Sequence, residues 1–231
     1  PLYSSAASDV YKRQMHCIEM AKKIAHSDIS VLLQGESGCG KELYAQAIHN
    51  ESERRRYPFI AINCAVLSGN MLESELFGYE NGAFTGAQKG GKAGLFEIAN
   101  KGTLFLDEIS EMDYTLQAKL LRALQERKIR RVGGTREIDI DVRIIGACNV
   151  NLEKYIQENK FRQDLYYRIA AIPLHLLPLR ERKGDVLPLI ENHLKKVSIQ
   201  NKKKIRLTEA ARNILLEYNW PGNVRELENI L

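Results

Sequence analysis

The residues between Val31 and Glu42 have the types and spacing needed to hold a phosphate group. The apolar run Val-Leu-Leu predicts a short buried strand, and a glycine-rich turn follows it and leads into helical sequence. In this arrangement glycines let backbone N–H groups turn inward, the helix N-terminus adds partial positive charge, and a lysine reaches the outer phosphates. The alternative is an ordinary glycine turn. The predicted phosphate-binding residues of this P-loop are Gly35, Glu36, Ser37, Gly38, Cys39, Gly40, Lys41 and Glu42.

A second stretch, Gly102 to Glu108, predicts a buried strand that ends in two carboxylates. We expect Asp107 to hold Mg²⁺, and Glu108 to orient and deprotonate the attacking water. Many P-loops carry a Ser or Thr ligand for Mg²⁺ where this chain has Glu42, so the metal should depend on Asp107, the phosphates and water. The alternative is a strand that happens to end at an acidic turn.

The remaining elements must position these groups. Further buried strands are predicted over 57–63, 142–147 and 171–176, and helical stretches alternate with the strands. The alternation predicts an α/β fold with a parallel five-stranded sheet and helices on both faces. Past residue 178 the strands stop, and Thr208 is expected to cap a helix within a small helical subdomain. The predicted apolar stripe of that helix is Ala211, Ile214, Leu215 and Tyr218, and a basic turn is expected over 129–134.

The stretch from Gly78 to Gly94 holds six of the sixteen glycines of the chain. A long loop inside a compact domain is usually functional or disordered. Two interpretations stay open from composition: a flexible linker, or a mobile loop that presents Phe84 and Thr85 to a partner.

The composition is that of a water-soluble chain of 231 residues that can bury one core and a small satellite. It has no apolar run of membrane-spanning length and no signal-peptide pattern. Four scattered cysteines without a C-x-x-C pair predict neither a disulfide framework nor a zinc site, and we expect a reducing cytoplasm. The net charge of +5 is mild, so the basic clusters at 54–56 and 202–204 are interpreted as solvated faces rather than nucleic-acid contacts.

Several segments together resemble the AAA+ central domain of sigma-54-dependent transcription activators, the bacterial enhancer-binding proteins. The resemblance covers about residues 15–231, and it implies an AAA+ P-loop NTPase with a helical lid. The P-loop and the acidic strand are shared with many ATPases, whereas the hexapeptide at 82–87 is close to diagnostic. The matching segments are Gly-Glu-Ser-Gly-Cys-Gly-Lys-Glu at 35–42, Glu-Leu-Phe-Gly at 75–78, Gly-Ala-Phe-Thr-Gly-Ala at 82–87, Gly-Thr-Leu-Phe-Leu-Asp-Glu at 102–108, Phe-Arg-Gln-Asp-Leu-Tyr-Tyr-Arg at 161–168 and Trp-Pro-Gly-Asn-Val-Arg-Glu-Leu at 220–227.

The resemblance implies a role for each matching site residue. Asp107 and Glu108 would form the Walker B pair, and Asn63 would hold the catalytic glutamate in check. Asn149 matches the sensor I position, and Arg225 matches the sensor II arginine. Arg162 and Arg168 match arginine fingers, which project into the site of a neighbouring subunit. The residues expected to grip the sigma factor are Gly82, Ala83, Phe84, Thr85, Gly86 and Ala87.

The implied function is hydrolysis of ATP with Mg²⁺, coupled to remodelling of the closed promoter complex of sigma-54 RNA polymerase holoenzyme. A finger supplied by a neighbour makes hydrolysis depend on assembly, and the family likeness implies a homohexameric ring. The state of the nucleotide would bias the loop at 78–94 between two positions. The alternatives are another AAA+ remodelling ATPase, a nucleotide-binding regulator that does not hydrolyse ATP, and a plain DNA-binding module.

Two departures and the domain limits complete these expectations. Cys39 and Cys148 stand where the family usually has threonine, which puts the fine tuning of nucleotide sensing in doubt. We expect a disordered or non-native lead over 1–14, an ATPase subdomain over 15–177 and a truncated lid over 178–231. Signal input and DNA binding would then depend on modules outside this chain.

Overall fold

A computed structural model describes residues 19–84, 89–200, 202, 205 and 207–231 of the chain. The described residues form two compact units. The sheet unit comprises residues 21–34 and 42–174, and the helical unit comprises residues 19–20, 35–41 and 175–231. The phosphate loop predicted from the sequence is therefore grouped with the helical unit, although a strand of the sheet unit leads into it.

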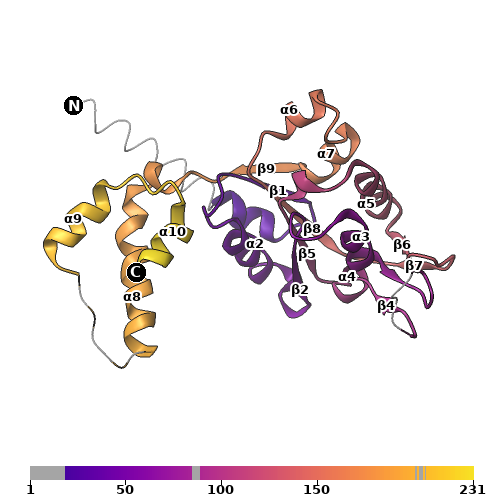
Figure 1. Cartoon of the computed structure of the whole chain (residues 1–231), viewed down its shortest axis with the longest axis horizontal. Helices are drawn as coiled ribbons and strands as arrows, with labels where there is room; N and C mark the ends of the chain where they lie inside the picture. The colour runs from indigo at the N-terminus through magenta and orange to yellow at the C-terminus, as the bar shows by residue number, and fades with distance from the viewer. Residues whose placement is uncertain (1–18, 85–88, 201, 203–204, 206) are drawn as a thin grey trace. The chain divides into compact units, whose positions relative to one another are not determined.

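A five-stranded sheet is the centre of the sheet unit, with the order β2-β5-β8-β1-β9 (Figure 1). The pairs β2·β5, β5·β8 and β1·β8 are parallel, so the carboxyl ends of these four strands meet at one edge. The predicted α/β fold with a five-stranded parallel sheet and a helical lid is confirmed. The strands are β1 (Val31–Gln34), β2 (Phe59–Asn63), β5 (Thr103–Asp107), β8 (Arg143–Cys148) and β9 (Ile172–His175).

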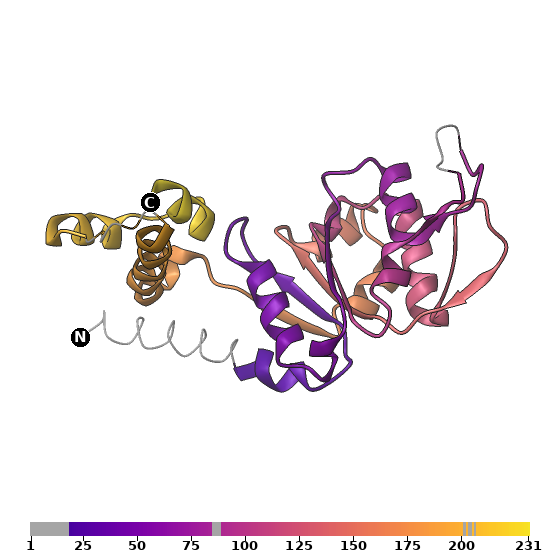
Figure 2. The ribbon, with the colours of Figure 1, turned by 90° about the horizontal axis from the view of Figure 1, so that it is seen from below.

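Helices lie on both faces of this sheet, as the two views in Figures 1 and 2 show. Within the described part of the chain, no helix combines the length and apolarity needed for a membrane crossing. The α-helices are α2 (Lys41–Asn50), α3 (Gly69–Phe77), α4 (Leu95–Ile98), α5 (Tyr114–Glu126), α6 (Leu152–Gln157), α7 (Gln163–Ile169), α8 (Val186–Gln200), α9 (Glu209–Glu217) and α10 (Asn223–Ile230). Residues 19–25 are also helical, and the 3₁₀ turns are η1 (Glu53–Arg56), η2 (Ile109–Glu111), η3 (Leu179–Glu181) and η4 (Lys183–Asp185).

Alternate residues of the central strands bury the two faces of the sheet. Leu104 and Leu106 of β5 belong to the core that also contains apolar side chains of α3, α5 and α7. Phe105, between them, points to the opposite face, where its ring stacks on Phe59 with centroids 6.2 Å apart. Phe59 in turn contacts His49 of α2. A strand buried on both faces needs a continuous apolar run, which is the pattern of this sequence.

Two predicted loops are wrong in part, because short antiparallel ladders lie within them. β3 (Gly78–Tyr79) pairs with β4 (Lys92–Ala93), so the glycine-rich stretch begins and ends in a two-stranded sheet. β6 (Lys128–Arg130) pairs with β7 (Glu137–Asp139), so the predicted basic turn at 129–134 starts inside a strand. The alternating charged residues of β6 face solvent and conceal the strand pattern around the buried Ile129.

The helical unit has a separate core, formed by Leu179, Val186, Ile190, Leu194, Trp220 and Leu227. Trp220 anchors it by donating its indole N–H to the Leu215 carbonyl at 3.0 Å. Thr208 caps α9 as predicted, since its side chain accepts from the Ala211 N–H. The predicted apolar stripe of α9 is wrong in part: Ile214 is 68% exposed, whereas Leu215 and Leu216 pack on the core.

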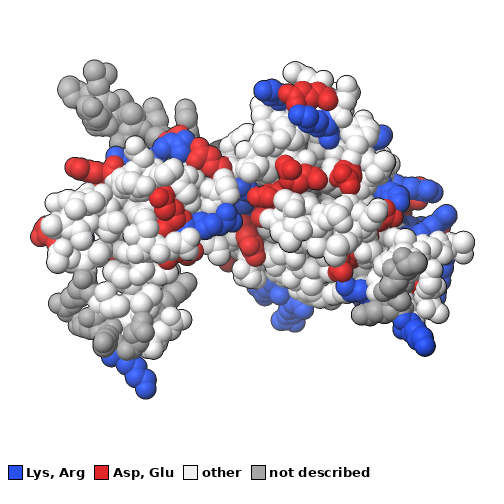
Figure 3. Space-filling view, viewed as in Figure 1, with Lys and Arg blue, Asp and Glu red and all other residues white. Residues whose placement is uncertain are grey.

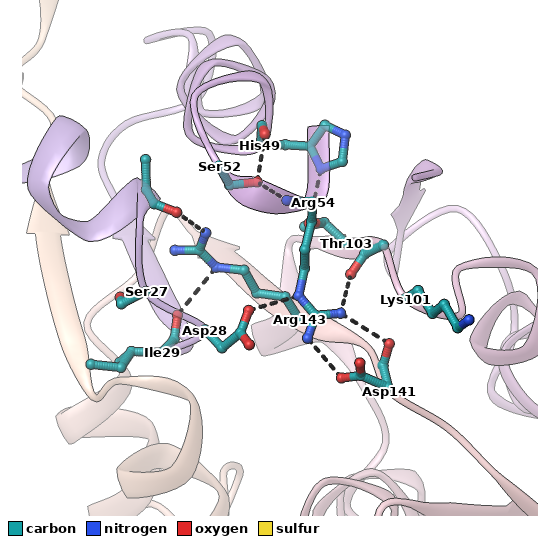
Figure 4. A network of polar contacts seen from close by, with 12 residues as sticks. Ser27, Asp28, Ile29, His49, Ser52, Arg54, Lys101, Thr103, Asp141 and Arg143 are labelled. Atoms are coloured by element: carbon teal, nitrogen blue, oxygen red, sulfur yellow. Dashed lines mark hydrogen bonds and ion pairs between the residues drawn. The ribbon is translucent and has the colours of Figure 1, made fainter. Parts of the chain in front are cut away.

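A buried arginine joins β8 to the helix over residues 19–25. Arg143 is 2% exposed and donates to the carbonyls of Ile24, Ala25 and Ile29 at 2.9, 3.0 and 3.3 Å (Figure 4). Carbonyl groups at a helix C-terminus lack partners within the helix, so a cation there satisfies and stabilises them.

Arg54 lies beside Arg143 and bridges two loops of the sheet unit (Figure 4). It forms ion pairs with Asp28 and Asp141, both at 2.7 Å, and its side chain is only 12% exposed. The hydrogen bond from Arg54 lowers the pKa of Asp28 below its usual value. The interpretation of 54–56 as a solvated face is therefore wrong for Arg54. In the other basic cluster, Lys203 and Lys204 lie outside the described residues.

Replacing Arg143 by Met should lower the free energy of unfolding of the sheet unit by about 2–4 kcal/mol, because buried carbonyls lose charged donors. Urea unfolding followed by circular dichroism measures the change. Arg136→Met is the matched control, since Arg136 is exposed and its substitution should cost less than about 0.5 kcal/mol. Equal losses for the two variants would show that the Arg143 contacts do not stabilise the unit.

Candidate active site

The phosphate loop connects β1 to α2 and has the backbone of an anion cradle. Gly38 and Gly40 have φ angles of +76° and +94°, which L-residues with side chains rarely adopt. A Cβ atom on Gly38 would also lie 2.4 Å from the Gly222 carbonyl oxygen, so glycine is required on both counts. Lys41 begins α2, is 8% exposed, and donates from Nζ to the carbonyls of Gly35 and Glu36 at 2.8 and 3.1 Å. A buried ammonium among loop carbonyls at a helix start suits a phosphate ligand.

Side chains from the rest of the helical unit hold the outer side of this loop. Arg180 forms a two-bond ion pair with Glu36, at 2.6 and 2.8 Å, which lowers the pKa of the Glu36 carboxyl. Arg225 donates to Ser37 Oγ at 3.0 Å. Arg182 donates to the Cys39 carbonyl at 2.6 Å, while no partner of its buried Nε is found among the described residues.

The predicted carboxylates lie at the carboxyl edge of the sheet. Asn63, the last residue of β2, is the register partner of Asp107, the last residue of β5. Glu108 follows in a left-handed conformation with φ of +50°, and its backbone N–H donates to Asp107 Oδ1 at 3.0 Å. This turn ends the strand directly after Asp107. The sheet thus brings Asn63, Asp107 and Glu108 together.

Asn63, Cys64 and Asn149 lie at or beside this edge of the sheet. The Asn63 side-chain oxygen accepts from the Ala65 N–H at 2.8 Å, so restraint of Glu108 by Asn63 stays a prediction. Burial, together with the nearby Asp107 and Glu108, raises the pKa of the Cys64 thiol to about 12. Asn149 follows directly after Cys148, the register partner of Gln34, and is exposed. The β8 end therefore reaches the same edge as the β1 end.

The predicted Mg²⁺ site depends on few ligands from the protein. Among the described residues, no three His, Cys, Asp or Glu side chains are grouped as a metal cage. Asp107 alone is still a suitable donor, because Mg²⁺ is commonly held by one or two carboxylates plus phosphates and water. The donor set fits a shared metal rather than a metal held by the protein alone.

The two predicted arginine fingers lie at opposite ends of α7. Their hydrogen-bond partners are Asp164 and the Leu124 carbonyl, not Asp107 or Glu108. Arg162 precedes the helix and pairs with Asp164 at 2.7 and 3.0 Å, over the ring of Tyr114. Arg168 lies in the last turn and donates to the Leu124 carbonyl at 2.9 Å. The sequence did not predict these resting partners.

The glycine-rich stretch is braced at its base by the β6–β7 hairpin. Glu80 N–H donates to the Val132 carbonyl at 3.0 Å, and Val132 N–H donates to the Gly78 carbonyl at 2.9 Å. Arg131 forms a two-bond ion pair with Glu97, at 2.8 and 2.9 Å. The sequence did not predict that this hairpin braces the glycine-rich stretch, because the charged residues of β6 conceal its strand pattern.

Within that stretch, Phe84 is 45% exposed and lies edge-on to Tyr79, with ring centroids 5.0 Å apart. Gly82 has a φ of +76° and Ala83 N–H donates to the Glu80 carbonyl, so a turn precedes the aromatic ring. The other predicted partner-binding residues, Thr85, Gly86 and Ala87, lie outside the described residues.

Comparison with known proteins gives the family. The model of the sigma-54 interaction domain matches residues 9–175, and that of the AAA+ ATPase lid domain matches residues 180–231. A signal-transduction and transcriptional-control protein of Clostridium beijerinckii is 56% identical over 216 residues, which are 92% of this chain and 34% of that protein. The regulatory protein AtoC of Escherichia coli K12 is 53% identical over 210 residues, 90% of this chain and 45% of AtoC.

Solved structures agree with this assignment. Crystal structures of NtrX from Brucella abortus in complex with ADP and with ATP match at 35% identity and a TM-score of 0.86, over 94% of this chain and 47% of NtrX. The chain spans about a third of the Clostridium beijerinckii relative and under half of AtoC. Because the family model covers most of its residues, the chain belongs to the sigma-54 interaction domains of the AAA+ ATPases.

Proposed function

We propose that this chain is the ATP-hydrolysing core of a sigma-54-dependent transcription activator, and that it remodels the closed promoter complex of RNA polymerase. The phosphate loop carries the proposal: two glycines with positive φ and a buried lysine at a helix start form a cradle for phosphate. The ADP and ATP complexes of NtrX make adenine nucleotides the proposed ligands here. The alternative of a different AAA+ remodeller lacks the sigma-54 interaction domain match.

The proposed nucleotide site uses residues from several elements. The backbone N–H groups of 35–42 would hold the phosphates, and Lys41 would neutralise their charge. Arg225 and Asn149 would sense the terminal phosphate, as sensor II and sensor I residues. Bound Mg²⁺ supplies charge neutralisation at the phosphates, and Asp107 is its proposed protein ligand.

The proposed chemistry depends on positioning and charge. Glu108 would hold a water molecule for attack and accept its proton, and Asn63 would restrain Glu108 between cycles. Arg162 and Arg168 would act in the site of a neighbouring subunit, so we propose a homo-oligomeric ring, most simply a hexamer. Contact with DNA would need a further domain, and we expect the activator to work in the reducing cytoplasm.

The proposed partner surface is the stretch at 82–87, with Phe84 at its centre. Its half-exposed ring follows a turn, and the β6–β7 hairpin braces the base of the stretch. A nucleotide-dependent shift of this stretch would transmit work to sigma-54. Basic and acidic side chains are interspersed on the face drawn in Figure 3. This mixed charge favours a protein partner over nucleic acid attracted by a basic surface.

The test is binding of purified sigma-54 in the presence of ADP–aluminium fluoride, which mimics the hydrolytic transition state. We expect stable binding by the parent chain, and Phe84→Ala should weaken it by at least about tenfold with ATPase activity retained, since central aromatic contacts carry most binding energy. Tyr57→Ala is the matched control, because Tyr57 is 46% exposed against 45% for Phe84.

Absence of sigma-54 binding by the parent chain would contradict the proposed partner and favour a general AAA+ remodeller. Equal binding by the Phe84→Ala and parent chains would instead move the contact away from this stretch. Both outcomes are separate from nucleotide hydrolysis, which is measured on the same samples.

A further inference from the structure

Glu36 lies inside the phosphate loop, but its side chain is held by the helical unit. Its two carboxylate oxygens accept from Arg180 Nη2 at 2.6 Å and Nη1 at 2.8 Å. Asn223 Nδ2 donates to the same carboxylate at 3.2 Å. Three donors fix the plane of the carboxylate, which makes this contact more specific in geometry than a single ion pair.

The main-chain carbonyl of Glu36 accepts a hydrogen bond from Lys41, the lysine proposed to bind the phosphates. Lys41 Nζ donates to the Glu36 carbonyl oxygen at 3.1 Å and to the Gly35 carbonyl oxygen at 2.8 Å. One residue therefore connects Arg180, through its side chain, to the ammonium group of Lys41, through its main chain. A shift of Glu36 would move an acceptor that positions this ammonium group.

Asn223 explains how the helical unit holds its side of the contact. It is fully buried with a φ of +54°, a conformation that asparagine tolerates better than most residues. Its Oδ1 accepts from the Leu179 N–H at 2.7 Å, and its Nδ2 also donates to the Ser37 carbonyl at 3.1 Å. With every polar atom of its amide engaged, Asn223 is fixed against η3 on one side and against the loop on the other.

We propose that Glu36 is a positioning residue for nucleotide binding: through Arg180 and Asn223 it holds the phosphate loop, and with it Lys41, in the geometry that receives the phosphates. The inference rests on the proposed function of the loop as an ATP site. It adds Glu36, Arg180 and Asn223 as the group that sets the shape of the loop, beyond the glycines within it.

Electrostatics alone predicts the opposite effect for the key variant. Glu36→Gln removes a negative charge beside the phosphate loop and leaves the Arg180 cation uncompensated. If charge attraction decided affinity, this variant would bind anionic nucleotides more tightly. If positioning decides, binding weakens, because the Nε2 group of Gln is a donor and cannot accept, so the variant loses at least one of the two hydrogen bonds from Arg180. The sign of the change separates the two effects.

The experiment measures ADP binding by titration calorimetry for the parent chain, Glu36→Gln, Arg180→Gln and the double variant. We expect each single variant to bind ADP about tenfold more weakly, the size of one charged hydrogen-bond contact, and the double variant to bind no more weakly than the singles. In ATPase assays the change should be in KM, with kcat within about twofold of the parent chain. The Glu191→Gln variant is the matched control, since Glu191 pairs with Arg212 in the same unit and should leave ADP affinity unchanged.

Tighter or unchanged ADP binding by Glu36→Gln, with the parent chain binding ADP, would overturn this inference alone. No ADP binding by the parent chain would overturn the proposed function and this inference with it. Circular dichroism of the nucleotide-free variants verifies folding. If Glu36→Gln fails to fold, Asn223→Gly decides by the same ADP measurement, because it removes the donors to Glu36 and Ser37 without changing the net charge, and glycine adopts a φ of +54° readily. Unchanged ADP binding by Asn223→Gly would then overturn the inference.

Discussion

A chain carrying Glu108→Gln should bind ATP as tightly as the parent chain and hydrolyse it about 10²–10⁴-fold more slowly, the usual contribution of a general base. The amide keeps the size of the side chain and its hydrogen-bonding reach, but it cannot accept the proton of the attacking water. Glu108 lies in a left-handed turn with φ of +50°, and Gln keeps the same backbone demands as Glu. The loss should therefore reflect chemistry rather than folding.

Phosphate release measures the rate, and calorimetry with a slowly hydrolysed ATP analogue measures binding. Glu111→Gln is the matched control, since Glu111 is an exposed carboxylate at the end of the 3₁₀ turn that follows Glu108, and it accepts a weak contact from Ser110 at 3.3 Å. Full activity of Glu108→Gln would remove Glu108 from the mechanism. An inactive parent chain that still binds ATP would favour a regulator that does not hydrolyse nucleotide.

The sheet and the phosphate loop were predictable because their signals are local in the sequence. A continuous apolar run such as the one ending at Asp107 favours a strand buried on both faces, and all five strands appear within two residues of the predicted limits. Gly38 and Gly40 have the positive φ angles that make glycine necessary in the loop. These features depend on near neighbours in the chain, which a sequence pattern records directly.

Contacts between distant residues were not predictable in the same way. Glu36 and Arg180 are 144 positions apart, and nothing in either neighbourhood indicates that their side chains meet. In α9 the helical spacing of the apolar residues is clear, but the face that they bury is not. Each residue advances the helix by about 100°, so Ile214 and Leu215 belong to two different apolar faces, and the sequence does not show which of them packs on the core. Only packing against the core shows that Leu215 is inward and Ile214 exposed.

The residue roles differ in what supports them. Position on the sheet edge brings Asn63, Asp107 and Glu108 together, and this arrangement of parallel strands supports the joint action that we propose for them. Arg162 and Arg168 have resting partners of their own, and their proposed role requires a second subunit. A test for these arginines must therefore mix chains rather than examine one variant alone.

Arg168→Ala should reduce ATP hydrolysis by about 10³-fold or more, the contribution expected of an arginine finger at the transition state. In the resting structure Arg168 makes one hydrogen bond to the Leu124 carbonyl at an exposed position. Releasing a single exposed contact costs roughly 1 kcal/mol, which is small beside the proposed gain at the transition state. Arg122→Ala is the control, because Arg122 is an exposed arginine on α5 in a simple ion pair with Glu126.

Mixing Arg168→Ala with Glu108→Gln then distinguishes a finger that acts in a neighbour from one that acts in its own subunit. Each variant is inactive alone, but an interface between them can combine Glu108 of one chain with Arg168 of the other. Recovered hydrolysis in the mixture, rising with total protein concentration, is the expected result. A mixture of the Glu108→Gln chain with a chain that carries both Glu108→Gln and Arg168→Ala should stay inactive, since no chain in it retains the general base. If the first mixture also stays inactive although the chains associate, Arg168 acts within its own subunit, and hydrolysis no longer requires a ring.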